Sequence, residues 1–206
     1  GVHTTKLGPF EITVVSDGAL ELPISFLLPK ADKAEVDALL AKAGQDRSSV
    51  MAPLNVVLVK RGADTVMIDC GAGSGFVGTA GRMSAALEQA GIATDAVTSL
   101  VFTHAHPDHL WGVIDDLDEV RFGKAKHVIG AAEWDYWINP ETAGKVPESF
   151  QAMAAGSLRR LKALEDRIER VKGGHKIADG ISVIDTPGHT PGHQSILIEA
   201  GNDKLL

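Results

Sequence analysis

One short stretch of this chain constrains its fold and chemistry more than any other. Directly after the apolar residues 100–102, four metal-competent side chains lie within six positions: His104, His106, Asp108 and His109. In an extended segment alternate side chains project to one side, so His104, His106 and Asp108 would face the same way. Pro107 favours an extended residue before it and suits the first position of a short helix. Imidazole and carboxylate groups are common ligands of divalent ions, so this stretch predicts a metal site.

A second histidine motif lies further along the chain. Residues 185–193 read Asp-Thr-Pro-Gly-His-Thr-Pro-Gly-His and directly follow the apolar, strand-like residues 181–184. A polar loop containing several histidines would be the simpler interpretation of either motif alone. Two such motifs, each at the end of a strand-like run, favour one metal site that both supply.

The hydrophobic pattern predicts interleaved strands and helices. Strands are expected at residues 10–14, 55–60, 65–69, 100–102, 127–129, 181–185 and 195–199. Helices are expected at residues 32–43, 82–90, 131–137 and 147–172, with Gly156 as a candidate break in the last. Residues 20–30 predict a packed arm without regular structure, and residues 45–51 predict a loop. Two mixed sheets packed together with helices outside, an α/β class, suit this order.

These motifs resemble those of the metallo-β-lactamase superfamily, which pairs HxHxDH after a strand with a distant TPGHTPGH. Three further stretches, LGPFEITVVSDGALELP, VMIDCGAGSGF and AAEWDYW, are similar to methyl parathion hydrolase and to N-acyl homoserine lactonase-like members. The likeness extends from about residue 7 to residue 206. It implies an αββα sandwich with the metal ions at one edge of the sheets.

The resemblance also implies which residues hold metal ions. One Zn²⁺ ion would bind to His104, His106 and His189, and a second to Asp108 and His109, although other divalent ions suit these ligands. Asp108 is also the candidate catalytic residue. Three protein ligands leave one coordination position for water. The implied reaction is the hydrolysis of an ester-type bond, in an organophosphate triester or a lactone, by a metal-bound hydroxide.

Two residues are expected to support these ligands without binding metal. Asp69 ends an apolar run, and the resemblance implies that it orients a ligand imidazole. A turn-initiating Asp before Gly71 is the alternative role. His193, the last residue of the second motif, is expected to be structural.

The resemblance places three aromatic residues at substrate-pocket positions: Phe76, Trp137 and Phe150. Core packing is the alternative for such residues, because aromatic side chains at helical spacing commonly face a core. An apolar pocket suits a neutral ester, lactone or phosphotriester as the small-molecule partner. The competing hypotheses are a β-lactamase or thioester hydrolase of the same fold, an iron-redox relative and a non-catalytic binding protein.

Size and charge narrow the partners. A chain of 206 residues suits one domain. The net charge of −7, without a block of Lys or Arg, argues against nucleic acid or an anionic membrane as the main partner. No apolar run reaches the length of a membrane span, so we expect a soluble protein of the cytoplasm or the periplasm. A homodimer is compatible with the resemblance.

We expect the single domain, residues 1–206, to be truncated at its C-terminus. Two-metal members of the superfamily also use a bridging Asp and a last His, which we expect beyond Leu206. The strand that starts near Asp203 would be interrupted there, and an interrupted strand leaves backbone groups unpaired. A naturally short member of the superfamily is the alternative.

Overall fold

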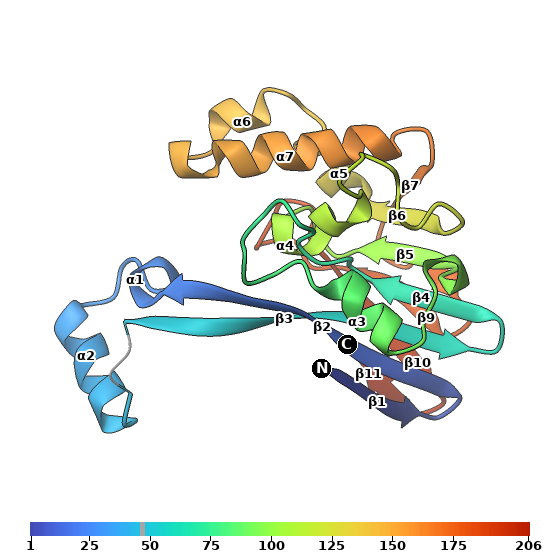
Figure 1. Cartoon of the computed structure of the whole chain (residues 1–206), viewed down its shortest axis with the longest axis horizontal. Coiled ribbons are helices and arrows are strands. Elements are labelled where there is room, and N and C mark those ends of the chain that lie inside the picture. The colour runs from blue at the N-terminus through green and yellow to red at the C-terminus, as the bar shows by residue number, and fades with distance from the viewer. Residues whose placement is uncertain (46–47) are drawn as a thin grey trace.

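The computed structural model describes residues 1–45 and 48–206, which form two packed β-sheets with helices (Figure 1). The larger sheet has its strands in sequence order: β1 (Val2–Leu7), β2 (Phe10–Pro23), β3 (Ser49–Arg61), β4 (Asp64–Ile68), β5 (Ser99–Phe102), β6 (Lys126–Gly130) and β7 (Ile168–Val171). Strands β1 to β4 pair antiparallel, and β4 to β7 pair parallel. This sheet is therefore mixed, as the sequence predicts.

The smaller sheet follows at the C-terminal end of the chain. Its order is β11 (Asp203–Leu205), β10 (Gln194–Ala200), β9 (Ile181–Asp185) and β8 (Lys176–Ala178). All its described pairings are antiparallel. A strand begins at Asp203, where the sequence predicts one.

The helices connect or cover strands of the larger sheet. They are α1 (Ile24–Leu27), α2 (Lys33–Lys42), α3 (Met83–Gln89), α4 (Pro107–Leu110), α5 (Ala131–Trp137), α6 (Thr142–Lys145) and α7 (Glu148–Leu164), with 3₁₀ turns η1 (Thr94–Ala96) and η2 (Trp111–Val113). Helix α3 contacts β2, and α5 contacts β6 and β7. Among the described residues, no helix has both the length and the hydrophobicity needed to cross a membrane.

Strand β5 shows why the layers stack as they do. All four of its residues are buried. Leu100 and Phe102 belong to the core beneath the helices, whereas Val101 belongs to the core between the two sheets. A strand in a parallel array with both faces covered is apolar throughout. The carboxyl ends of β4, β5 and β6 consequently meet at one edge of a rigid sheet.

The sequence-based prediction of one helix over residues 147–172 is wrong at its C-terminal end. Helix α7 ends at Leu164, and β7 (Ile168–Val171) pairs parallel to β6. Backbone pairing with β6 and burial of Val171 outweigh the local helical periodicity. Helix α7 is not broken at Gly156: a Cβ there would lie 2.1 Å from the Trp111 ring, so the glycine allows the two to pack closely.

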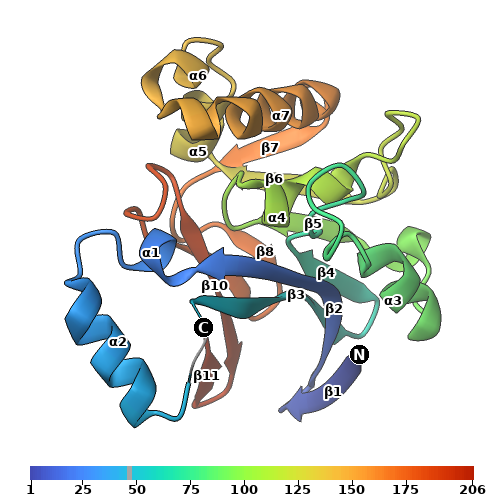
Figure 2. The same ribbon diagram turned by 60° about the vertical axis from the view of Figure 1, so that its left-hand side comes forward.

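The prediction for residues 20–30 is also wrong. Strand β2 continues to Pro23, paired with β3 as far as Ser49, and residues 24–27 form α1. We call residues 20–45 and 48–53 the arm, which projects from the body of the molecule in both views (Figures 1 and 2). Of the loop expected at 45–51, residues 46 and 47 lie outside the described residues, and residues 49–51 belong to β3.

Helix α2 is confirmed where the sequence predicts a helix. The Asp32 side chain caps its first turn by accepting a hydrogen bond from the backbone N–H of Glu35 at 3.0 Å. Its apolar face, however, is only partly covered: Val36 and Leu40 are half-buried, Leu39 is 64% exposed, and none of the described residues of α2 is buried.

Candidate metal centre

The two histidine motifs meet at the edge of the sheets where β5 ends. His106 is extended, with φ −68° and ψ 156°, and occupies the position before α4, in which Pro107 is the first residue. His189 lies in the connection between β9 and β10. The backbone N–H of Gln194 donates to the carbonyl of Thr103 at 3.0 Å, which ties the second motif to the end of β5.

Three ring nitrogens from the two motifs converge. His106 Nδ1 lies 3.1 Å from His104 Nε2 and 3.0 Å from His189 Nε2. All three nitrogens lie within 4.8 Å of one another. A tetrahedral zinc ion with Zn–N bonds of about 2.0–2.1 Å would hold its ligand nitrogens about 3.3 Å apart. The arrangement of His104, His106 and His189 therefore fits a divalent metal ion.

The protonation of these three imidazoles suits that use. Burial and then the His109 charge lower the pKa of His104 far below its ordinary value. Burial and His189 lower the pKa of His106 to about 4. Burial and His193 also lower the pKa of His189. Metal ligation requires neutral imidazole, so near pH 7 no proton has to be displaced from these rings.

A second group of side chains lies beside this triad. His109 Nδ1–H donates to Asp69 Oδ2 at 2.8 Å, and His109 Nε2 faces Asp108 Oδ2 at 3.2 Å. Burial alone would lower the pKa of His109, but the Asp69 and Asp108 carboxylates raise it to about 10. Burial of Asp108 opposes its ionisation, whereas the hydrogen bond from His109 favours it. The pKa of Asp108 is lowered overall. A cation at His109 Nε2 and Asp108 would thus replace a proton rather than occupy a neutral site.

Asp69 also fixes the orientation of His104 through Thr103, a residue that the sequence analysis did not identify. The Thr103 hydroxyl donates to Asp69 Oδ2 at 2.8 Å. We therefore assign His104 Nδ1–H as the donor to Thr103 Oγ1 at 2.9 Å, which leaves Nε2 free for metal. Asp69 has φ +59°, so it also makes the turn that was its alternative role. For Thr103, the only signal in the sequence is that it directly precedes His104.

Glu133 is the second site residue that the sequence analysis did not identify, and it is fully buried in α5. It accepts hydrogen bonds from Ala105, between the first two histidines, and from Thr190 and Gly192 in the second motif. The available sequence signal was an acid flanked by Ala132 and Trp134 in AAEWDYW, four positions before Trp137.

The other predicted site residues have varied surroundings. His193 Nδ1 pairs with Thr186 Oγ1 at 2.9 Å and is not among the three converging histidines. The buried Trp137 ring packs 5.6 Å from the His106 ring. Phe76 instead packs edge-on against Trp111, and Phe150 stacks on Phe26 of the arm. The structure thus brings one of the three predicted pocket aromatics into contact with the histidines.

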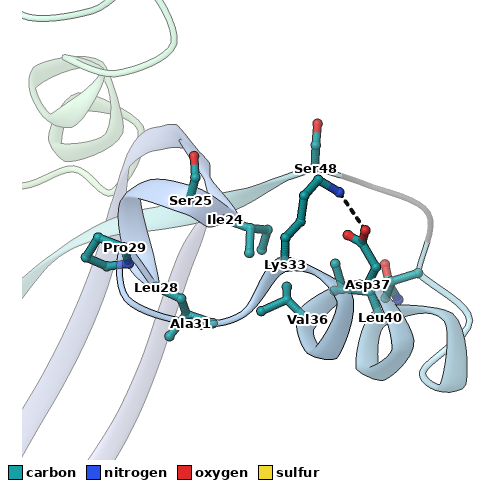
Figure 3. Close-up of a pocket in the computed structure, with 11 residues that line it drawn as sticks. Ile24, Ser25, Leu28, Pro29, Ala31, Lys33, Val36, Asp37, Leu40 and Ser48 are labelled. Carbon is teal, nitrogen blue, oxygen red and sulfur yellow. Dashed lines mark hydrogen bonds and ion pairs between the residues drawn. The ribbon is translucent and has the colours of Figure 1, made fainter.

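A large hollow lies elsewhere in the molecule, between α1, α2 and the tip of the arm (Figure 3). Its volume is about 610 Å³, and Ile24, Val36 and Leu40 are among its lining residues. The Lys33–Asp37 ion pair crosses one side of it. None of its described lining residues belongs to the predicted site, so this hollow is separate from the histidine cluster.

The chain is similar in sequence to proteins named N-acyl homoserine lactonase. The N-acyl homoserine lactonase AttM of Rhizobium radiobacter is 32% identical over 114 residues, 53% of this chain and 39% of AttM. An N-acyl homoserine lactonase of Bacillus cereus is 26% identical over 125 residues, 61% of this chain and 42% of that protein. The match therefore spans about two fifths of the length of these relatives.

Solved structures match over more of the chain. AidC, described as a dizinc quorum-quenching lactonase in complex with a product N-hexanoyl-L-homoserine, has a TM-score of 0.89 and 26% identity, covering 99% of this chain and 72% of AidC. The hydrolase AbOPH, of the β-lactamase superfamily, has a TM-score of 0.87 and 28% identity over the same shares. The profile of the metallo-β-lactamase superfamily matches residues 52–206. The chain therefore belongs to the metallo-β-lactamase superfamily.

Proposed function

We propose that this chain forms the metal centre of a metal-dependent hydrolase that opens lactones, with N-acyl homoserine lactones as the substrate class. The observation that carries the proposal is the convergence of His104 Nε2, His106 Nδ1 and His189 Nε2 from two distant loops. The names of AttM and AidC support the choice of lactone. The organophosphate triester predicted from the sequence is the second substrate to test.

In this proposal, different residues bind the metal ions and orient the ligands. His104, His106 and His189 hold one Zn²⁺ ion, and Asp108 and His109 contribute to a second. When bound to these residues, a divalent ion would supply Lewis acidity, which lowers the pKa of a coordinated water toward about 7 and polarises a carbonyl group. Thr103 and Asp69 keep the protons on the Nδ1 atoms of His104 and His109, so that both Nε2 atoms face the centre.

The environment of the centre supports a neutral substrate. Trp137 presents an apolar ring beside His106, and an uncharged acyl chain suits such a surface. Phe76 and Phe150 remain proposals as pocket residues. The bridging Asp and last His expected beyond Leu206, the truncation of the domain and the homodimer also remain predictions.

Metal content and substrate turnover test this proposal together. The purified protein should contain zinc by mass spectrometry and should acidify a solution of N-hexanoyl homoserine lactone as the ring opens. His106→Ala should lose bound metal and lower kcat/KM by more than about 100-fold, the upper range for residues that only support a ligand. The exposed His3→Ala is the matched control and should change neither quantity.

The substrate panel should include a phosphotriester, a penicillin and a thioester. Faster hydrolysis of the penicillin or the thioester than of the lactone would reject the proposed substrate class. Wild-type metal content and turnover in His106→Ala would reject the proposed metal centre.

A further inference from the structure

The buried carboxylate of Glu133 accepts four hydrogen bonds. Its Oε1 accepts from the backbone N–H of Ala105 at 2.9 Å and from Trp137 Nε1–H at 2.6 Å. Its Oε2 accepts from the Thr190 hydroxyl at 2.7 Å and from the backbone N–H of Gly192 at 3.0 Å. These four donors come from three separate segments of the chain.

The number and type of these partners require the Glu133 side chain to accept hydrogen bonds at both oxygens. All four contacts are donated to Glu133, and an ionised carboxylate is an acceptor with two oxygens and no donor. An amide in its place would direct an NH₂ group at two donors. Buried polar groups that lose their partners are costly, so the four donors depend on the charged side chain.

Three of the four donors, Ala105, Thr190 and Gly192, lie within the two histidine motifs. Ala105 separates His104 from His106, and Thr190 directly follows His189. One carboxylate therefore holds the backbone of both motifs at a set separation, and β6 and α5 anchor that carboxylate to the sheet. The fit is close: a Cβ on Gly192 would lie 1.9 Å from the backbone nitrogen of Glu133.

Trp137 links Glu133 to the ring of His106. It lies one helical turn after Glu133, and its indole N–H is bonded to Oε1 while its ring packs on His106. The Trp137 ring is thereby oriented by the same carboxylate that holds the backbone on each side of His106.

We propose that Glu133 is a positioning residue that sets the spacing between the His104–His106 pair and His189, and so the affinity and geometry of the metal centre. This inference rests on the proposed function only for the presence of a metal ion at these histidines. Gln194 gives a second link, because its backbone and side-chain N–H groups donate to Thr103 and Phe102. Gln194 holds only the base of the loops, whereas Glu133 contacts them between the histidines.

The test is a Co²⁺ titration of the metal-free protein in competition with a chelating dye. Glu133→Gln should bind Co²⁺ about 10- to 100-fold more weakly, as for other residues that orient metal ligands. The Co²⁺ visible absorption bands at saturation should also shift, because the ligand spacing changes. A loss of overall stability alone would not shift them. Asp135→Asn removes the same charge from an exposed site on the same helix and should leave affinity and spectrum unchanged.

A second variant covers the case in which Glu133→Gln does not fold. Thr190→Val removes one donor at nearly constant shape and should weaken Co²⁺ binding by roughly 3- to 10-fold, the loss of one hydrogen bond. Wild-type affinity and spectrum in Glu133→Gln, or in Thr190→Val where the first variant does not fold, would overturn the inference. His106→Ala in the same titration separates the two proposals, because wild-type Co²⁺ binding by that variant would instead reject the metal centre itself.

Discussion

The candidate metal centre and the arm place their side chains in contrasting surroundings. At the centre, Asp69 and Glu133 are buried, and each is hydrogen-bonded to the loops that carry the histidines. In the arm, none of the described residues of α1 and α2 is buried, and Phe26, Leu28 and Leu39 are more than half exposed.

The comparison shows what apolar sequence does in each place. The apolar residues of β5 lie between two layers and hold the histidine loop on a rigid base. Val36, Leu39 and Leu40 of α2 lie three and four positions apart, as on one face of a helix, yet none of them is buried. Hydrophobic pattern therefore indicates an element, and only its neighbours decide whether that element contributes to stability.

The largest expected difference between the two regions is in the cost of removing a leucine. Leu161 of α7 is fully buried in the core beneath the helices, whereas Leu39 is 64% exposed. Leu161→Ala should lower the free energy of unfolding by about 2–5 kcal/mol through lost burial and a cavity. Leu39→Ala should change it by less than about 0.5 kcal/mol. Urea denaturation measures both, and equal losses would mean that the arm is packed in solution.

A buried histidine sharpens the comparison through pH. His127 in β6 is 1% exposed, and its ring nitrogens have no hydrogen-bond partner among the described residues. Burial and then Arg167 lower its pKa from 6.5 to about 4. Below pH 6.5 the unfolded chain binds a proton that the folded chain does not bind until about pH 4. As the pH is lowered from 6.5 to 4, His127 therefore decreases the free energy of unfolding by about 3 kcal/mol.

The measurement is denaturation of His127→Leu at several pH values. The variant should lose that part of the decline between pH 6.5 and 4, while the exposed His3→Leu should keep the wild-type slope. An unchanged slope in His127→Leu would show that His127 finds a partner in solution.

The smallest expected effect is local to the arm. Asp32→Ala removes the side chain that caps α2 at the N–H of Glu35, which should destabilise that helix by about 1 kcal/mol. Because α2 buries none of its described residues, faster hydrogen exchange should be confined to α2 and metal affinity should not change. Asp37→Ala, which loses only the exposed ion pair with Lys33, should have a smaller effect. A drop in global stability in Asp32→Ala would contradict the independence of the arm.

Much of the fold followed from local patterns. The strands expected at residues 55–60 and 65–69, the extended His106 before Pro107 and the strand before His104 all agree with the sequence analysis. Strand β7 did not, because Ile168 and Val171 lie at helical spacing from the preceding leucines, and only the open edge of β6 makes them a strand. Residues 20–23 were missed for the same reason, since pairing with β3 gives them their structure.

The sequence alone determined which side chains can hold a metal ion, because ligand type and the alternation of His104 and His106 are local properties. It also determined the apolar strands that precede both motifs. The distances between His189 and the first two histidines come only from the tertiary structure, although the two motifs predicted a shared site. Only the tertiary structure decided that Thr103 and Glu133 contact the loops, since these contacts join residues from different strands and helices. The reason is that hydrogen bonding and burial depend on which residues are neighbours in space. Local sequence patterns do not show which distant segments become neighbours.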